Sequence, residues 1–197
     1  MKLPSIYLAS GSPRRRELLS QIGVQFDVLS VSVDESVLAG ELAADYVQRV
    51  AVDKAKAGLS LLQSRSDLVY RPILAADTAV IVDDTIFGKP TDDEQAKTFL
   101  QQLSGRQHQV LSSVVLATNK NITVRCQLNQ VRFANLSGAD IEWYIATGEG
   151  RDKAGSYAVQ GLAAQFIEHI DGSFSGIMGL PLFETRQLLQ ECLADEQ

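Results

Sequence analysis

An aspartate interrupts an otherwise apolar segment near the middle of the chain. Residues 73–82 read Ile-Leu-Ala-Ala-Asp-Thr-Ala-Val-Ile-Val, which is typical of a buried strand, and Asp77 lies within it. An isolated buried carboxylate is unfavourable, so it needs a cation, a metal ion or hydrogen-bond donors. A carboxylate on a strand is also suited to hold a metal or to accept a proton from water. Asp77 is therefore a candidate catalytic and metal-binding residue, with a structural ion pair as the alternative.

A lysine lies on the apolar face of a predicted helix. Within residues 42–63, Lys54 falls on the apolar face, whereas Lys56 points away from it. The apolar positions that define this face are Tyr46, Val47, Val50, Ala51, Ala57 and Leu61. Two interpretations stay open for Lys54. Its aliphatic stem can carry the ammonium group out to the surface, or the stem can cross the core and place the ammonium group in a cleft.

A turn of small residues precedes a helix rich in arginine. The segment 8–15 reads Leu-Ala-Ser-Gly-Ser-Pro-Arg-Arg, with Ser12 suited to the N-cap and Pro13 to the first helical position. Helix N-termini present free N–H groups and a partial positive charge, and both favour phosphate. Helical spacing puts Arg15 near the middle of the inward stripe, Arg14 at its edge and Arg16 outside it. Arg15 therefore pairs with an anionic ligand or, alternatively, with a nearby carboxylate, and Arg16 is expected at the surface.

Other charged residues follow two predicted strands. Lys89, in Gly88-Lys89-Pro90, comes after a predicted hairpin and can return toward Asp77. Asp34 and Glu35 end another predicted strand and add acidic groups. Solvation at the surface is the alternative for each of them.

Helices and strands alternate along the chain, which predicts an α/β fold with a mixed sheet. Ser12, the pair Thr91 and Glu94, and Ser137 are the predicted helix caps. The predicted strands span residues 6–9, 26–33, 72–82, 85–87, 109–118, 122–134 and 158–170. The predicted helices begin at residues 13, 42, 91, 137 and 181, and the last four end near residues 63, 103, 147 and 193.

The composition excludes several classes of protein. The chain has 197 residues, 45% of them hydrophobic, and its 18 basic and 24 acidic side chains give a net charge of −6. This charge argues against nucleic-acid and membrane partners.

The first residues do not form a signal peptide, and Cys126 and Cys192 have no metal-binding spacing, so we expect a cytoplasmic protein. Walker A and Gly-X-Ser-X-Gly motifs are absent. His108 and His169 are the only histidines, and His108 is expected to be structural.

The ordered set of motifs resembles the Maf family of nucleotide pyrophosphatases, in the branch that acts on dTTP and UTP. The resemblance covers nearly the whole chain. Its motifs are Leu8-Ala9-Ser10-Gly11-Ser12-Pro13-Arg14-Arg15, Lys54-Ala55, Ala76-Asp77-Thr78, Gly88-Lys89-Pro90, Asp152-Lys153-Ala154-Gly155-Ser156-Tyr157, Gln160-Gly161 and Gly179-Leu180-Pro181. The resemblance implies one domain over residues 1–197, with an elongated mixed sheet flanked by helices and two lobes around a deep cleft, similar to inosine triphosphate pyrophosphatases. Homodimers are also implied.

The resemblance also implies roles for individual residues. Asp77 matches the catalytic acid that activates water, and Glu35 matches an acidic position implicated with Asp77 in binding a divalent metal, Mg²⁺ or Mn²⁺. The positions associated with pyrimidine specificity are Arg14, Thr78 and Gln160. The positions expected to bind phosphate are Ser10, Ser12, Arg15, Lys54 and Lys89.

The expected reaction is attack of water on the α-phosphorus of dTTP, UTP and modified pyrimidine nucleotides, which releases pyrophosphate and serves to clean the nucleotide pool. Two alternatives stay open. One is a regulator of cell division that binds a nucleotide or nucleic acid without turnover, and the other is a phosphatase that removes the terminal phosphate. A carboxylate beside the bound anion argues against a pure phosphate binder.

Overall fold

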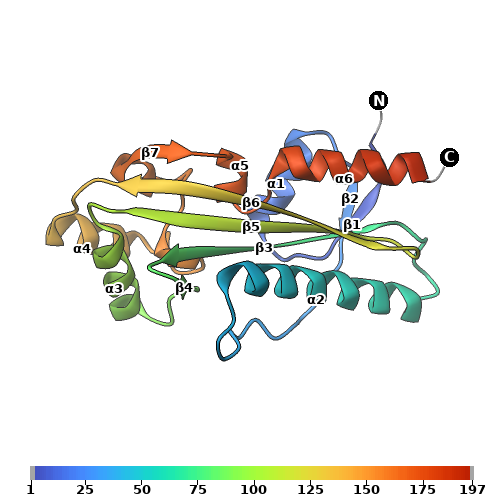
Figure 1. Ribbon diagram of the computed structural model, residues 1–197, viewed down its shortest axis with the longest axis horizontal. Coiled ribbons are helices and arrows are strands. Elements are labelled where there is room, and N and C mark those ends of the chain that lie inside the picture. Colours follow the sequence, from blue (N-terminus) through green and yellow to red (C-terminus); the bar gives the residue numbers. More distant parts are fainter. Residues whose placement is uncertain (1–2, 196–197) are drawn as a thin grey trace.

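A seven-stranded mixed sheet forms the centre of the molecule (Figure 1). The computed structural model describes residues 3–195, so the ends of the expected domain, residues 1–2 and 196–197, lie outside the described residues. The strands lie in the order β2-β1-β3-β5-β6-β7, and β4 pairs with β3. Strand β1 is parallel to β2 and β3, and the other pairs are antiparallel. The strands are β1 (Ile6–Leu8), β2 (Phe26–Val28), β3 (Ile73–Val82), β4 (Thr85–Phe87), β5 (Gln107–Ala117), β6 (Ile122–Phe133) and β7 (Ile167–Asp171).

Helices cover both faces of the sheet and one of its ends. Figure 1 shows α2 along one face of the long strands, α1, α5 and α6 on the other, and α3 and α4 at the end away from the termini. The helices are α1 (Pro13–Gln21), α2 (Ala43–Ser64), α3 (Asp93–Leu103), α4 (Gly138–Thr147), α5 (Phe174–Ile177) and α6 (Leu182–Asp195), with short 3₁₀ helices η1 (Ala154–Ser156) and η2 (Leu162–Phe166). The expected fold class, an elongated mixed α/β sheet flanked by helices, is confirmed.

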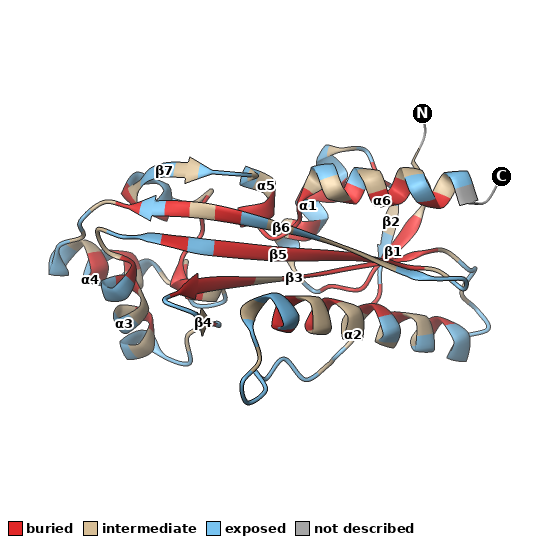
Figure 2. Ribbon diagram, in the orientation of Figure 1, coloured by how far each residue is buried: buried red, intermediate tan, exposed pale blue. Residues whose placement is uncertain are grey.

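Alternating side chains of β3 pack on opposite faces of the sheet, which is why this strand is apolar on both sides (Figure 2). Ile73 and Ala75 pack with the α2 residues Ala51 and Ala55. On the other face, Leu74 and Ala76 pack with residues of α1 and α6, namely Leu18, Leu19, Leu188 and Leu189. This alternation continues toward the end of the strand, so Asp77 is expected on the α2 face and Thr78 on the α1 face.

The helix boundaries follow the local sequence signals closely. Helix α1 has its N-cap at Ser12 and its first residue at Pro13, as predicted. Helix α4 has the predicted N-cap at Ser137, which forms a capping box with Asp140. The predicted cap of α3 was wrong by one residue: Asp92 is the N-cap, and its side chain accepts a hydrogen bond from the backbone N–H of Gln95.

Two predicted strands were too long. The strand predicted at 26–33 ends at Val28, because its partner β1 has only three residues with which to pair. The strand predicted at 158–170 is a turn followed by the 3₁₀ helix η2, and only residues 167–171 pair with β6. The short helix α5 was not predicted.

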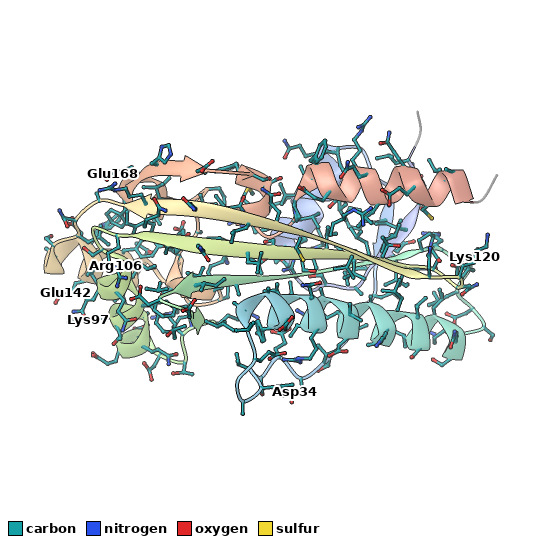
Figure 3. The ribbon with its side chains drawn as sticks, in the orientation of Figure 1. Asp34, Lys97, Arg106, Lys120, Glu142 and Glu168 are labelled. Carbon is teal, nitrogen blue, oxygen red and sulfur yellow. The ribbon has the colours of Figure 1, made fainter. Side chains whose placement is uncertain are left out.

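The charged side chains that Figure 3 labels lie on the outside of this framework; they are Asp34, Lys97, Arg106, Lys120, Glu142 and Glu168. Lys97 of α3 and Glu142 of α4 form an ion pair of 3.6 Å that links these two helices. Arg16 is exposed, as expected. Within residues 3–195, no helix combines the length and the apolar character that a membrane span requires.

Candidate functional site

A cleft of about 660 Å³ collects all of the predicted site residues. Its walls come from the turn before α1, from α2, from β3, from the loop after β4 and from the segments around η1 and α5. The predicted residues that line it are Ser10, Ser12, Arg14, Arg15, Glu35, Lys54, Asp77, Thr78, Lys89 and Gln160. The expected convergence of one acid with several cations is confirmed, and the role of each residue stays a prediction.

The cleft opens where one edge of β3 lacks a neighbouring strand. Strand β1 pairs with Ile73 and Leu74, and β4 pairs on the same side with Val80–Val82, while β5 occupies the opposite edge. In the described part of the chain, residues 75–79 therefore have no strand partner on this side. Because β1 runs parallel to β3, the chain leaves β1 in the direction of this gap. The turn before α1 consequently lies beside Asp77 and Thr78.

Lys54 joins two carboxylates. Its Nζ atom lies 2.7 Å from Oδ1 of Asp77 and 2.7 Å from Oε1 of Glu35. The side chain of Lys54 is only 11% exposed, so it does not carry its ammonium group out to bulk solvent. Of the two interpretations, the second is therefore supported, because the ammonium group enters the cleft.

The two carboxylates occupy different environments. Asp77 is 7% exposed and fixed on the central strand. Glu35 lies in the loop between β2 and α2, and its side chain is 43% exposed. Partial burial opposes ionisation of Glu35, but the ammonium group of Lys54, with weaker help from Lys89 and Arg15, lowers its pKa below the usual value. Both carboxylates thus face positive charge.

Arg15 is buried beside the same cleft. Its guanidinium donates hydrogen bonds to the carbonyl of Gly179 at 2.8 Å, to Oγ of Ser10 at 3.1 Å and to Oγ1 of Thr78 at 3.5 Å. Among residues 3–195 no carboxylate lies within ion-pair distance of it, so the simple salt-bridge alternative is wrong. Burial lowers the pKa of Arg15, whereas Asp77 and Glu35 act to raise it. A guanidinium group nevertheless stays protonated at neutral pH.

The three residues expected to set specificity all line the cleft, and Thr78 also contacts the guanidinium of Arg15. Oγ1 of Thr78 is 2.7 Å from Oγ of Ser112, which in turn donates to the carbonyl of Gly176 in α5. Arg14 forms an ion pair of 3.0 Å with Glu17 at the mouth of the cleft. Gln160 lines the cleft from the segment that follows η1. Their contribution to specificity stays a prediction.

Several residues at the cleft were not predicted. The side chain of Tyr46 donates to the carbonyl of Glu35 at 3.0 Å, and burial, then Asp77 and Glu35, raise its pKa to about 12. Asp152 and Lys153 pair with each other and line the cleft, and the sequence alone indicates no role for them. Tyr46 lies on the same helix face as Lys54, two turns earlier, and this spacing was the available signal. His108, by contrast, is buried and contacts Tyr157, which is the expected structural role.

Known proteins resemble the chain over most of its length. The dTTP/UTP pyrophosphatase of Chromobacterium violaceum is 50% identical over 186 residues, which are 94% of this chain and 93% of that protein. The protein of the same name from Aliivibrio fischeri is 48% identical over 188 residues, 95% of this chain and 98% of that protein. The structure of the Staphylococcus aureus Ham1 protein aligns over 98% of this chain and 100% of that chain, with 16% identity and a TM-score of 0.49. The model of the family described as Maf-like protein matches residues 5–192, so the chain belongs to the Maf-like family.

Proposed function

We propose that this protein hydrolyses dTTP and UTP to the monophosphate and pyrophosphate. The observation that carries the proposal is the position of Asp77, a buried carboxylate that faces Lys54, Arg15 and Lys89 across one cleft. The relatives that match nearly the whole chain at about half identity are named for this reaction. A site that only binds phosphate gains nothing from a carboxylate beside the anion.

The triphosphate would bind at the turn before α1. A nucleoside triphosphate carries roughly four negative charges near neutral pH, so its site must supply compensating charge. The N-terminus of α1, with Ser10 and Ser12 in the turn, provides N–H and hydroxyl donors. Arg15 lies behind this turn, while Lys89, whose side chain is 63% exposed and whose Nζ lies 4.0 Å from Oε2 of Glu35, would reach a phosphate from the entrance. The open edge of β3 adds backbone groups to the same wall.

Asp77 would act as the general base for the attacking water. Its carboxylate is held in place by Lys54, which fixes its orientation toward the cleft. Attack at the α-phosphorus expels pyrophosphate, whose charge the surrounding cations stabilise. Lys54 is thus a positioning residue for Asp77 and also a source of positive charge.

The reaction class implies a divalent metal, and the carboxylates fit one. Lys54 marks a position where carboxylates of Asp77 and Glu35 converge on a single cation. Among the described residues no group of three or more His, Cys, Asp or Glu side chains forms a metal cage. Mg²⁺ commonly binds through one or two carboxylates together with substrate phosphates, so this donor set suits it or Mn²⁺. When bound, the ion would neutralise phosphate charge and acidify a water molecule.

Pyrimidine recognition would depend on Gln160, with Thr78 and Arg14 shaping the same site. A site that pairs with the polar edge of a base rejects other bases strongly, because a mismatched base leaves buried polar groups unpaired. Modified pyrimidine triphosphates that keep this edge should also be substrates, which suits an enzyme that cleans the nucleotide pool.

Product analysis tests the reaction. The protein is incubated with dTTP, UTP, CTP, GTP or ATP and Mg²⁺ or Mn²⁺, and we expect pyrophosphate and monophosphate from dTTP and UTP. Orthophosphate with a diphosphate would indicate a phosphatase, and no product would favour a binding protein. Asp77→Asn should lower kcat by about 10²- to 10⁴-fold with little change in KM. Retention of most of kcat at saturating metal would refute the assignment of Asp77.

The same proposal includes a cytoplasmic location, a homodimer, no nucleic-acid or membrane partner, and a single domain of two lobes. Light scattering coupled to size-exclusion chromatography measures the molar mass of the protein in solution and so tests the homodimer. A monomer at micromolar concentration would contradict the dimer without affecting the proposed reaction.

A further inference from the structure

The segment that carries Gln160 is fixed from outside the cleft by two side chains. Tyr144 lies in α4 and Glu149 just after it, and neither belongs to the cleft wall. We propose that Tyr144 and Glu149 are positioning residues that hold the Gln160 segment, residues 158–163, in the geometry required for base discrimination. This inference rests on the proposed function, because it assigns a cause to the selectivity of that site.

Hydrogen bonds from this pair reach both ends of the segment. The hydroxyl of Tyr144 accepts a hydrogen bond from the backbone N–H of Ala158 at 3.2 Å. Oε1 of Glu149 accepts from the N–H of Leu162 at 2.9 Å, and Oε2 lies 3.4 Å from the N–H of Ala163. Gln160 therefore lies between two anchored points, two residues away from each.

The two anchors are joined to each other. The hydroxyl of Tyr144 donates to Oε2 of Glu149 at 2.8 Å, so one continuous chain of hydrogen bonds runs from Ala158 to Leu162. Tyr144 is 1% exposed, and burial, followed by the Glu149 carboxylate, raises its pKa well above the usual value. The phenol therefore stays protonated at neutral pH and keeps its role as donor to the carboxylate.

Gly161 leaves the space that this arrangement needs. A Cβ atom added at Gly161 would lie 2.1 Å from Oε1 of Glu149, which is far inside van der Waals contact. Because this oxygen is at the end of a flexible side chain, the carboxylate can swing away, but it then loses its bond to Leu162. Gly161→Ala is therefore a second way to release the segment, and it leaves both anchor residues unsubstituted.

Release of the segment should affect the base and spare the phosphates. The groups proposed to bind phosphate lie on the turn before α1, on α2 and after β4, and none of them touches Tyr144 or Glu149. Gln160 would sample several positions, so a matched pyrimidine would lose part of its advantage over a mismatched base. A residue that merely stabilised the fold would weaken both parts of the site together.

The test compares Glu149→Gln, Tyr144→Phe and Gly161→Ala with the wild type in the full-length protein. Tyr7→Phe is the matched control. Tyr7 lies on a strand outside the cleft, and the substitution removes the hydrogen bond from its phenol hydroxyl to the carbonyl of Val69. We measure kcat/KM for dTTP and for CTP, and the inhibition constant of pyrophosphate. Calorimetry with dTMP, dCMP and pyrophosphate repeats the comparison without turnover.

We expect each of the three variants to lower the preference for dTTP over CTP by roughly tenfold, mainly through KM for dTTP. Binding of pyrophosphate should stay unchanged, and Tyr7→Phe should keep the wild-type preference. An unchanged preference in Glu149→Gln and Gly161→Ala would overturn the inference, as would parallel losses of dTMP and pyrophosphate binding. A wild-type protein that hydrolyses no triphosphate would refute the proposed function instead, and the dTMP and pyrophosphate titrations would still decide the role of the two anchors.

Discussion

Lys54 separates two carboxylates that would otherwise repel each other, and its removal should expose that repulsion. The oxygens of Asp77 and Glu35 each lie 2.7 Å from Nζ, so they are no farther apart than twice that distance. At this separation two like charges repel by about 3 kcal/mol with an effective dielectric constant of ~20. The Glu35 side chain is 43% exposed, and solvent screening reduces the expected cost. We therefore expect Lys54→Met to lower the free energy of unfolding by about 1 to 3 kcal/mol.

Methionine is the appropriate replacement because it retains a long apolar stem on the buried face of α2. Lys56→Met is the matched control, since Lys56 is exposed on the opposite face of the same helix. Urea denaturation without divalent metal gives the free energies of unfolding. Thermal melts with increasing Mn²⁺ then show whether a metal ion relieves the repulsion, because a ligand that binds the folded state raises Tm.

The expected pattern is a loss of stability in Lys54→Met alone, together with a larger rise in Tm on addition of Mn²⁺ than the wild type shows. In the wild type the ammonium group of Lys54 already neutralises part of the charge of the two carboxylates, so a bound metal ion relieves less repulsion there than in the variant, which lacks that cation. Equal unfolding free energies for Lys54→Met and Lys56→Met, with equal responses to Mn²⁺, would show that the two carboxylates do not share one cation position.

Two further predictions concern the framework around the site. Burial lowers the pKa of His108 to about 4, so the neutral ring stabilises the fold above pH 6.5 and this contribution is lost as the pH falls toward 4. Between pH 6.5 and 4, the free energy of unfolding should fall about 3 kcal/mol more for the wild type than for His108→Gln. Parallel curves of unfolding free energy against pH for the two proteins would contradict this prediction. Gly155 has φ +66° and an added Cβ would come within 3.0 Å of Val80. Gly155→Ala should therefore cost about 2 to 4 kcal/mol, whereas Gly138→Ala, which meets nothing within 4 Å, should not destabilise, and similar urea midpoints for the two would refute the steric reason.

The charged residues of the site could be predicted because they violate the local pattern. Asp77 interrupts an apolar strand and Lys54 an apolar helix face, and a buried charge without a partner is too costly to be accidental. Such violations can be recognised from the sequence alone. The partner of each charge cannot, because Asp77 and Lys54 are 23 positions apart and meet only through packing of α2 on β3.

The segment around Gln160 was predicted poorly for a different reason. Its apolar composition indicated a strand, but the backbone N–H groups of Leu162 and Ala163 bond to the Glu149 carboxylate instead of to a neighbouring strand. When a side chain accepts the hydrogen bonds that a neighbouring strand would otherwise accept, the amino-acid sequence shows no periodic pattern that reports it. The one local sign was Gly161, whose lack of a side chain permits the close approach of that carboxylate.

The register of one short strand decides whether the phosphate-binding turn and the catalytic acid form a single site. Leu8 lies opposite Leu74, and the parallel direction sends residues 9–13 along β3 toward Asp77. An antiparallel β1 would send the same turn toward Ile73 and away from the acid. The gap in β3 between β1 and β4 then leaves that edge open to a substrate instead of to another strand. Neither the motif of the phosphate-binding turn nor the motif around Asp77 specifies this register. The register is set by the packing of Ile6 and Leu8 against α1 and α6. The chemistry of this site therefore depends on a three-residue strand that touches none of the reacting groups.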